Sequence, residues 1–376
     1  MMKKRLFVSL LIVFAFVGYL AFTVVDSKTP VATAAKATYS GTMYMAGMGG
    51  HFAKFDLTID PNDAENPLKV NKLNRIIIGS KKTHPTHDPR IDSNDRNTMF
   101  WSTYVLDPNG KMHVGKTDLK TGDVIKDVAM TPDPKAPGTK PPVYCASGQT
   151  AKSYMPVFMG VEGYVDVMDK ATLEVKHRMF VSDLGFKNGT YQFMHGASSP
   201  DGKKFLVALN ETVEGKSNGK INLVLVDLPS LEQGKWKEIT RNTITGEPGK
   251  TITFRMNFTS DNKHVFQSVA DRFWVLDANN LKLIDEKMVD GQSHDAFPTP
   301  DGKYAVLSIR NAADAVDEDG KQLIGKTITD GFVQLYDFEA KKIVGSQVST
   351  CNACHKKMGQ GDKSAVLCGI DGNWKM

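Results

Sequence analysis

The fold is decided by the stretch His294–Asn311, which reads HDAFPTPDGKYAVLSIRN. It contains a short strand, a Pro-Asp-Gly turn and a second apolar strand, which is the order of an antiparallel hairpin. The element recurs less regularly from His195 (HGASSPDGKKFLVALN), from Asn257 (NFTSDNKHVFQSVA) and from His87 (HDPRIDSNDRNTMFWSTYV). Such a recurrence indicates one supersecondary unit copied along the chain.

A second recurring element is an apolar strand that ends in aspartate and is followed by a short turn and another strand. These strands are spaced by 50 to 62 residues and end at Asp56, Asp118, Asp169, Asp227, Asp277 and Asp337. Four strands per unit with tight polar turns are typical of a β-propeller blade. We therefore predict an all-β fold over residues 36–376, a single β-propeller of six blades by repeat count that both chain termini close.

Residues 1–35 have a different character. A basic start (Lys3–Arg5), an apolar run (Leu6–Val25) and the small-residue triplet Ala32–Ala34 follow one another. This is the order of a secretory signal peptide, with cleavage expected after Ala34. An uncleaved anchor is the alternative, because the apolar run has the roughly 20 residues that a bilayer span needs. Either way, we expect the rest of the chain to be exported.

The formal charge argues against a nucleic-acid partner. Residues 1–34 carry four basic residues and one acidic residue, so their removal lowers the charge from +5 to +2. The remaining chain has no Lys/Arg cluster of the kind that binds phosphates. It also lacks a glycine-rich phosphate loop and a Gly-x-Ser-x-Gly elbow, which disfavours nucleotide chemistry and serine hydrolysis.

Near the C-terminus, CNACH places Cys351, Cys354 and His355 in the attachment pattern of a c-type haem. Both thiols would bind the haem covalently, and His355 would be the metal ligand to its iron. Because 21 residues follow His355, too few for a cytochrome domain, a haem would have to lie on the propeller itself. The alternative is that CNACH forms a strand whose cysteines make disulfides.

Three histidines start the recurring hairpins and are candidate catalytic residues: His87, His195 and His294. We expect them, with His355, to form a partial ring at one mouth of the central channel, joined by the aspartates that follow His87 and His294. They would bind a metal, face a haem or relay protons. The alternative is that each histidine caps its own blade through a backbone hydrogen bond. His84 could take the place of His87.

The other two cysteines, Cys145 and Cys368, are most simply paired as a disulfide, although four cysteines allow three pairings. The methionines of MYMAGMGG, Met43, Met45 and Met48, have the spacing of a copper site but are more typical of core packing. A long acidic insertion, residues 312–330, is expected to be a loop that contacts partners.

The hairpins HDAFPTPDGKYAVLS and HGASSPDGKKFLVAL resemble those of the YncE-like propellers and of the cytochrome cd-type nitrite reductases. In these groups, histidines at the channel mouth lie on the inner strands. The resemblance covers nearly all of residues 38–376 and implies seven or eight blades. It concerns fold more than reaction, because many propellers share the Pro-Asp-Gly hairpin.

The length, export signal and single propeller with long loops are also similar to the beta subunits of hydrazine synthases, the anammox complexes that join nitric oxide and ammonium. That resemblance implies an accessory subunit, itself non-catalytic, of an oxidoreductase complex of nitrogen metabolism. Its haem-containing partner subunits would carry the reaction haems, and CNACH would need none. It places the chain in a periplasm-like compartment or the anammoxosome lumen, with membrane contact only through residues 6–25 if they are retained.

Two other functions are compatible with the sequence. One is a single-haem c-type cytochrome that transfers electrons, with haem c at Cys351, Cys354 and His355. The other is an enzyme whose site is the histidine-lined channel mouth.

Overall fold

Antiparallel strands dominate the computed structural model, which describes residues 35–136, 144–159, 162–316, 321–328, 331–350 and 368–375. For residues 193, 313–316 and 322–328 it describes the backbone alone. The described residues from Lys36 onward belong to one compact unit. The predicted signal peptide or anchor lies outside the described residues, except for Ala35. In the part of the chain that is described, no helix has the length and apolar character needed to cross a membrane.

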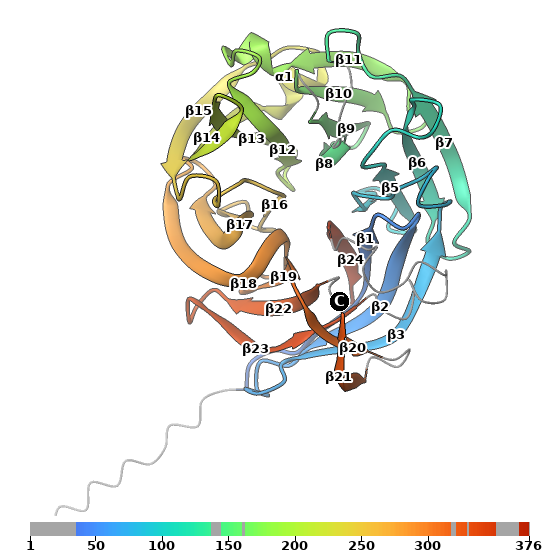
Figure 1. Cartoon of the computed structure of the whole chain (residues 1–376), viewed down its shortest axis with the longest axis vertical. Coiled ribbons are helices and arrows are strands. Elements are labelled where there is room, and N and C mark those ends of the chain that lie inside the picture. Colours follow the sequence, from blue (N-terminus) through green and yellow to red (C-terminus); the bar gives the residue numbers. More distant parts are fainter. Residues whose placement is uncertain are drawn as a thin grey trace, which may run out of the picture. The chain divides into compact units, whose positions relative to one another are not determined.

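Five sheets of four or more strands surround a common centre and make a β-propeller (Figure 1). The first two blades, each in spatial order, are β24 (Ile370–Trp374), β1 (Tyr39–Gly47), β2 (His51–Ile59) and β3 (Leu68–Ile77), then β4 (Arg90–Ile91), β5 (Thr98–Ser102), β6 (Met112–Asp118) and β7 (Val124–Met130). The next two are β8 (Tyr144–Gln149), β9 (Ser153–Phe158), β10 (Tyr164–Asp169) and β11 (Val175–Phe180), then β12 (Tyr191–Ser198), β13 (Lys204–Val213), β14 (Lys216–Asp227) and β15 (Glu238–Thr245).

The fifth blade has six strands: β16 (Met256–Phe258), β17 (His264–Asp277), β18 (Leu283–Pro298), β19 (Tyr304–Arg310), β22 (Phe332–Asp337) and β23 (Lys342–Val348). The predicted blade numbers, six from the repeat and seven from the resemblance, are therefore wrong. Two repeat units share this sheet because β18 runs through both: Met288 in its first half pairs with β17, and Ala296 in its second half pairs with β19.

The first blade combines strands from the two ends of the described propeller. β24 pairs with β1 in antiparallel register from Gly41 opposite Trp374 to Met45 opposite Ile370. The C-terminal strand is thus the innermost strand of a blade whose other strands come from the N-terminal side (Figure 1).

The repeated aspartates form the turns that follow their strands. Oδ1 of Asp118 accepts a hydrogen bond from the backbone N–H of Lys120 at 2.7 Å, and Oδ1 of Asp277 accepts one from Asn279 at 2.8 Å. Asp side chains favour such turns because they bond backbone two residues further on. The repeat visible in the sequence therefore reports turn geometry.

Each Pro-Asp-Gly turn is closed by a hydrogen bond between two of its side chains. The hydroxyl of Ser199 donates to Asp201 at 2.6 Å, and that of Thr299 donates to Asp301 at 2.9 Å. Gly302 follows with a φ of 70°, a left-handed conformation that glycine adopts without steric cost.

Adjacent blades pack through buried apolar clusters. Phe100 of β5 stacks on Tyr154 of β9 with ring centroids 4.7 Å apart, which joins two neighbouring blades. Met43 and Met45 are fully buried in another such cluster, so they are core residues as expected. Within the six-stranded sheet, Phe266 of β17 contacts Tyr336 of β22 edge to face at 6.3 Å. The two repeat units that share this sheet therefore also pack against each other.

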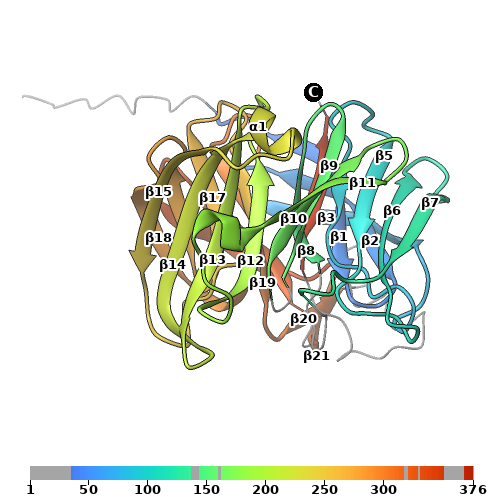
Figure 2. The same ribbon diagram turned by 90° about the horizontal axis from the view of Figure 1, so that it is seen from above.

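Few described segments lie outside the blades. They include the 3-10 helix η1 (Val181–Leu184) and the short helix α1 (Leu228–Glu232), where Asp227 caps the N-terminus. The insertion expected to be a loop is in part a two-stranded hairpin of β20 (Ala313–Val316) and β21 (Gln322–Ile328), separate from the blades (Figure 2).

Candidate functional site

A cavity of about 370 Å³ lies where the inner strands of several blades begin. Its walls combine thiol, imidazole, phenol and guanidinium groups with apolar side chains. The lining residues with these functional groups are His87, Tyr104, Cys145, His294, Arg310 and Cys368. Most of them come from segments at the starts of inner strands, whereas Tyr104 follows β5 and Arg310 ends β19; blade packing brings them together. We call this space the His–Cys cavity.

The predicted histidines lie at this cavity. His87 and His294 line it, and Nε2 of His195, a completely buried residue, is 3.0 Å from Sγ of Cys145 in the cavity wall. Nε2 of His87 is 3.8 Å from the same sulfur. Cys145 is therefore the link between two of the three candidate histidines.

Hydrogen bonding sets the tautomer of His87. Its Nδ1 is 2.6 Å from the carbonyl oxygen of Tyr144, which can only accept, so Nδ1 carries the proton. Burial lowers the pKa of His87 well below its usual range, and the neighbouring Arg255 guanidinium adds to this effect. Nε2 is consequently an unprotonated acceptor that faces Cys145. The expectation that each histidine caps its own blade is not met by His87, because Tyr144 belongs to the next blade.

His294 is held differently. Its Nε2 is 2.8 Å from the side-chain oxygen of Gln292, and its ring stacks on Phe254 with centroids 4.4 Å apart. Burial also lowers the pKa of His294 well below its usual range. The cavity therefore presents neutral imidazoles at neutral pH.

The two cavity cysteines are free thiols, so the predicted disulfide between Cys145 and Cys368 is not formed in the structure. Burial raises the pKa of Cys145 strongly and that of Cys368 to about 11. A thiol of this kind donates a hydrogen bond and is a poor nucleophile at neutral pH. Sulfur and imidazole nitrogen together form a donor set suited to soft transition metals.

Below the cavity lies a layer of buried charge. Arg255 is fully buried and donates from Nε to Asp88 at 3.2 Å. Arg90 lies 3.2 Å from Asp88 and 3.8 Å from Asp295. The two aspartates expected to join the histidines at the channel mouth thus bridge inner strands of different blades instead. Burial raises the pKa of Asp295, and both arginines oppose that rise.

The haem-attachment residues Cys351, Cys354 and His355 lie outside the described residues. The described residues on either side of their segment contact adjacent positions of β1. The hydroxyl of Thr350 bonds Sδ of Met45 at 3.2 Å, and the N–H of Cys368 bonds the carbonyl of Ala46 at 2.9 Å. Thr350 and Cys368 therefore lie at neighbouring positions of the ring, and Cys368 lines the cavity.

Sequence reasoning missed Cys145 and Arg255 as site residues. Cys145 occupies the irregular position at the start of its inner strand, where the β8–β9 register shifts, as His294 does where the β18–β19 register shifts. Extending the repeat alignment to units without a histidine at this position would have found Cys145. His84, considered as a substitute for His87, lies elsewhere, beside Asp127.

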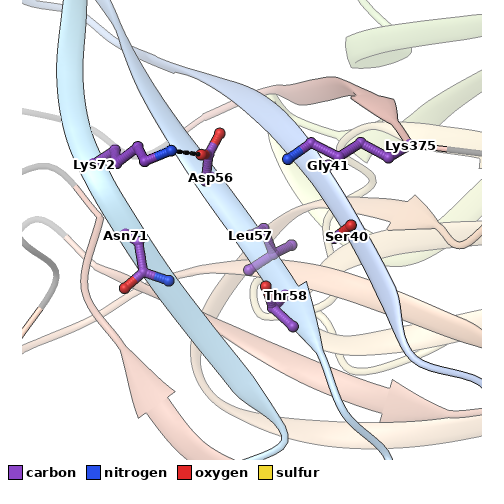
Figure 3. A pocket seen from close by; sticks show the side chains of 8 residues that line it. All are labelled: Ser40, Gly41, Asp56, Leu57, Thr58, Asn71, Lys72 and Lys375. Atoms are coloured by element: carbon purple, nitrogen blue, oxygen red, sulfur yellow. Dashed lines mark ion pairs between the residues drawn. The ribbon is translucent and has the colours of Figure 1, made fainter.

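Other hollows are less suited to chemistry. Figure 3 shows one of about 390 Å³ on the first blade, where Asp56 forms a 3.2 Å ion pair with Lys72. The Lys72 side chain is 82% exposed, so this ion pair contributes little to the stability of the fold. A polar hollow of about 510 Å³ lies beyond the other ends of the inner strands, near Gln149, Ser199 and Asp371.

Comparison with known proteins identifies no family for this chain. No protein-family model matches the chain, and no curated protein sequence matches it. Among solved structures, the chain is similar to the β-propeller domain of Myceliophteria thermophila Cps50 (Swd1), with 11% identity and a TM-score of 0.42, over 70% of this chain and 86% of that one. The assignment of the fold rests on the strand pairing of the chain itself. The chain is a β-propeller whose His–Cys cavity has to be interpreted from its own residues.

Proposed function

We propose that this protein is an exported c-type cytochrome of β-propeller fold, in which haem c bound at Cys351, Cys354 and His355 works at the His–Cys cavity. The observation that carries the proposal is the position of Thr350 and Cys368, which hold both ends of the attachment segment at adjacent residues of β1. Because Cys354 and His355 follow Thr350 within five residues, their distance from this anchor is limited to about 18 Å.

The cavity residues are compatible with a haem neighbour. His87 and His294 are neutral, and Met48 and Met159 add thioether groups to the lining. Imidazole and thioether are the side chains that most often ligate or surround haem iron. Bound haem would supply one-electron transfer. The chain's own contribution would be to hold the group through two thioether bonds and His355, and to place uncharged imidazoles and the ring of Phe254 beside it.

The proposal is tested by the pyridine haemochrome spectrum and the intact mass of the full chain from a host that matures c-type cytochromes. We expect a c-type spectrum and one covalent haem per chain, lost in Cys351→Ala. Cys145→Ala is the matched control: it removes a cavity thiol outside the attachment pattern and should retain the haem. A colourless wild-type protein would overturn the proposal.

A second candidate function is a haem-free accessory subunit of a multihaem nitrogen-redox complex, of the hydrazine synthase beta type. It is favoured by the hairpin β20–β21, which follows β19 just after the cavity residue Arg310 and is separate from the blades (Figure 2). A hairpin of this kind is a suitable docking element for a partner. This candidate predicts a colourless chain that co-purifies from its native cells with haem-containing subunits, and purification alone would contradict it.

A further inference from the structure

Two histidines and two aspartates that the proposed function does not use converge on the second blade. His113 lies on β6 and Asp127 on the adjacent β7, on the same face of the sheet. Asp107 lies in the turn that precedes β6, and His84 lies in the segment that enters the blade from β3. Side chains from the entering segment, the turn and two strands thus meet at one point.

The geometry of the group is that of a ligand set. Nε2 of His84 is 2.9 Å from one oxygen of Asp127, and Nδ1 of His113 is 2.9 Å from the other. One donor atom from each of these three residues lies within 4.8 Å of the other two. Nε2 of His113 is 3.5 Å from Oδ2 of Asp107. Ligands of one first-row metal ion are separated by distances of this size, since each bond is about 2.0 to 2.2 Å.

The surroundings hold these side chains in place. A Cβ atom on Gly79 would lie 2.4 Å from Nδ1 of His84, so glycine at this position leaves room for the imidazole. Oδ1 of Asp107 accepts backbone N–H groups from Asn109 and Lys111 at 2.9 and 2.7 Å, which orients Oδ2 toward His113. The Asp107 and His113 side chains are only 9% and 10% exposed.

One ring nitrogen of the group has only a distant partner among the described residues. Nε2 of His113 is buried, and the Asp107 oxygen that faces it is 3.5 Å away. The imidazole rings of His84 and His113 are 4.4 Å apart. A divalent cation between these side chains would satisfy the carboxylate oxygens and the imidazole nitrogens together.

We propose that His84, His113 and Asp127 bind one divalent first-row metal ion of the zinc type, with Asp107 as the partner of the other ring nitrogen of His113. Two imidazoles with carboxylate oxygens match the donor set of zinc, whereas calcium and magnesium take oxygen ligands almost alone. The site would anchor the segment that ends at His87 to the second blade. It is independent of the haem proposal.

The test is calorimetric titration of the metal-free full chain with Zn²⁺. We expect wild type to bind one equivalent of Zn²⁺. In His84→Gln and in His113→Gln the affinity for this equivalent should fall by more than about 100-fold, because loss of an outer-shell partner already costs up to about 100-fold. Asp123→Asn, an exposed acid on the same blade, is the matched control and should bind like wild type. Cys351→Ser/Cys354→Ser should also retain this equivalent.

Two further measurements keep the test decisive. Far-UV circular dichroism of the metal-free variants should match wild type, which excludes misfolding as the cause of lost binding. Cobalt bound at this site should absorb in the visible without the intense near-ultraviolet band of thiolate ligands. The proposal is overturned if wild type binds no ion, if the histidine variants keep the same number of equivalents, or if the cobalt spectrum shows thiolate ligation.

Discussion

At the scale of single residues, Cys145 determines what the His–Cys cavity can do. Its sulfur lies between His87 and His195, yet burial raises its pKa, so at neutral pH it is a thiol that donates to an imidazole. A site with neutral imidazoles beside a protonated thiol is suited to contact a planar redox group such as haem. It is poorly suited to nucleophilic catalysis, which needs a thiolate. This chemistry supports the choice of a redox role over a hydrolytic one.

Asp371, on the far side of the ring, gives a pH prediction. Burial raises the pKa of its carboxyl from 3.8 to about 6. Because folding disfavours the ionised form, the destabilising contribution is absent below pH 3.8 and complete above about pH 6. We predict that Asp371→Asn is more stable than wild type at pH 7 by about 1 to 2 kcal/mol, less than the full linkage value because the side chain is partly exposed.

Urea unfolding of wild type and Asp371→Asn at several pH values measures this difference. The amide can still accept the hydrogen bond from the backbone N–H of Ile91, which Asp371 accepts at 2.8 Å. The difference in unfolding free energy should grow between pH 4 and pH 6. A difference that does not vary over this range would show that Asp371 ionises normally in the folded protein.

At the scale of the structural element, the repeated aspartates should matter through their turns. Asp277→Ala removes the acceptor for the N–H groups of Asn279 and Asn280, bonded at 2.8 and 3.1 Å. We predict a loss of about 1 kcal/mol in unfolding free energy, the usual net value of such a bond. Asp277→Asn retains an acceptor oxygen and should lose less. Denaturant titrations would contradict the turn explanation if both variants lost the same amount.

The sequence predicted the hairpins well because their signals are local. The Asp277 turn and the Asp301 turn depend on residues at most a few positions away. The number of blades could not be obtained in this way. β18 joins two repeat units into one sheet, and no sequence feature of β18 indicates that the strand continues from one unit into the next. Repeat spacing counts units, whereas strand pairing decides how the units are grouped into sheets.

The same distinction applies to the sites. His87, His195 and His294 were visible as repeat positions, so their convergence at one end of the ring was predictable. Cys145 interrupts that pattern with a different residue type, and the sequence predicts for it only a disulfide with Cys368. The grouping of His84 with His113 depends on tertiary packing between a connecting segment and β6, for which the sequence carries no periodic signal.

At the scale of the whole molecule, buried ion pairs connect different blades across the centre of the ring. Arg255 precedes β16, whereas its partner Asp88 precedes β4 in another blade, and both are completely shielded from solvent. Arg255→Leu would leave Arg90 as the remaining ion-pair partner of the Asp88 carboxylate, which also accepts from the Ser147 hydroxyl. Removing one partner of a buried ion pair typically costs about 3 to 5 kcal/mol. We predict a loss of that size in unfolding free energy.

Arg241→Leu is the matched control for this substitution. Arg241 pairs with Glu238 on the outer strand β15, and its side chain is 49% exposed. Exposed pairs contribute about 1 kcal/mol or less. Equal losses in the two variants, measured by urea unfolding at neutral pH, would contradict the view that the central charges connect the blades.

The most direct test of the central claim, that haem bound at the attachment segment works at the His–Cys cavity, is the reduction potential of the purified full chain. We predict that His294→Ala, which alters a cavity wall, shifts the potential relative to wild type. Gln149→Ala, in the hollow at the opposite end of the ring, should leave it unchanged. Identical potentials in all three proteins, or no redox-active haem in wild type, would contradict the account.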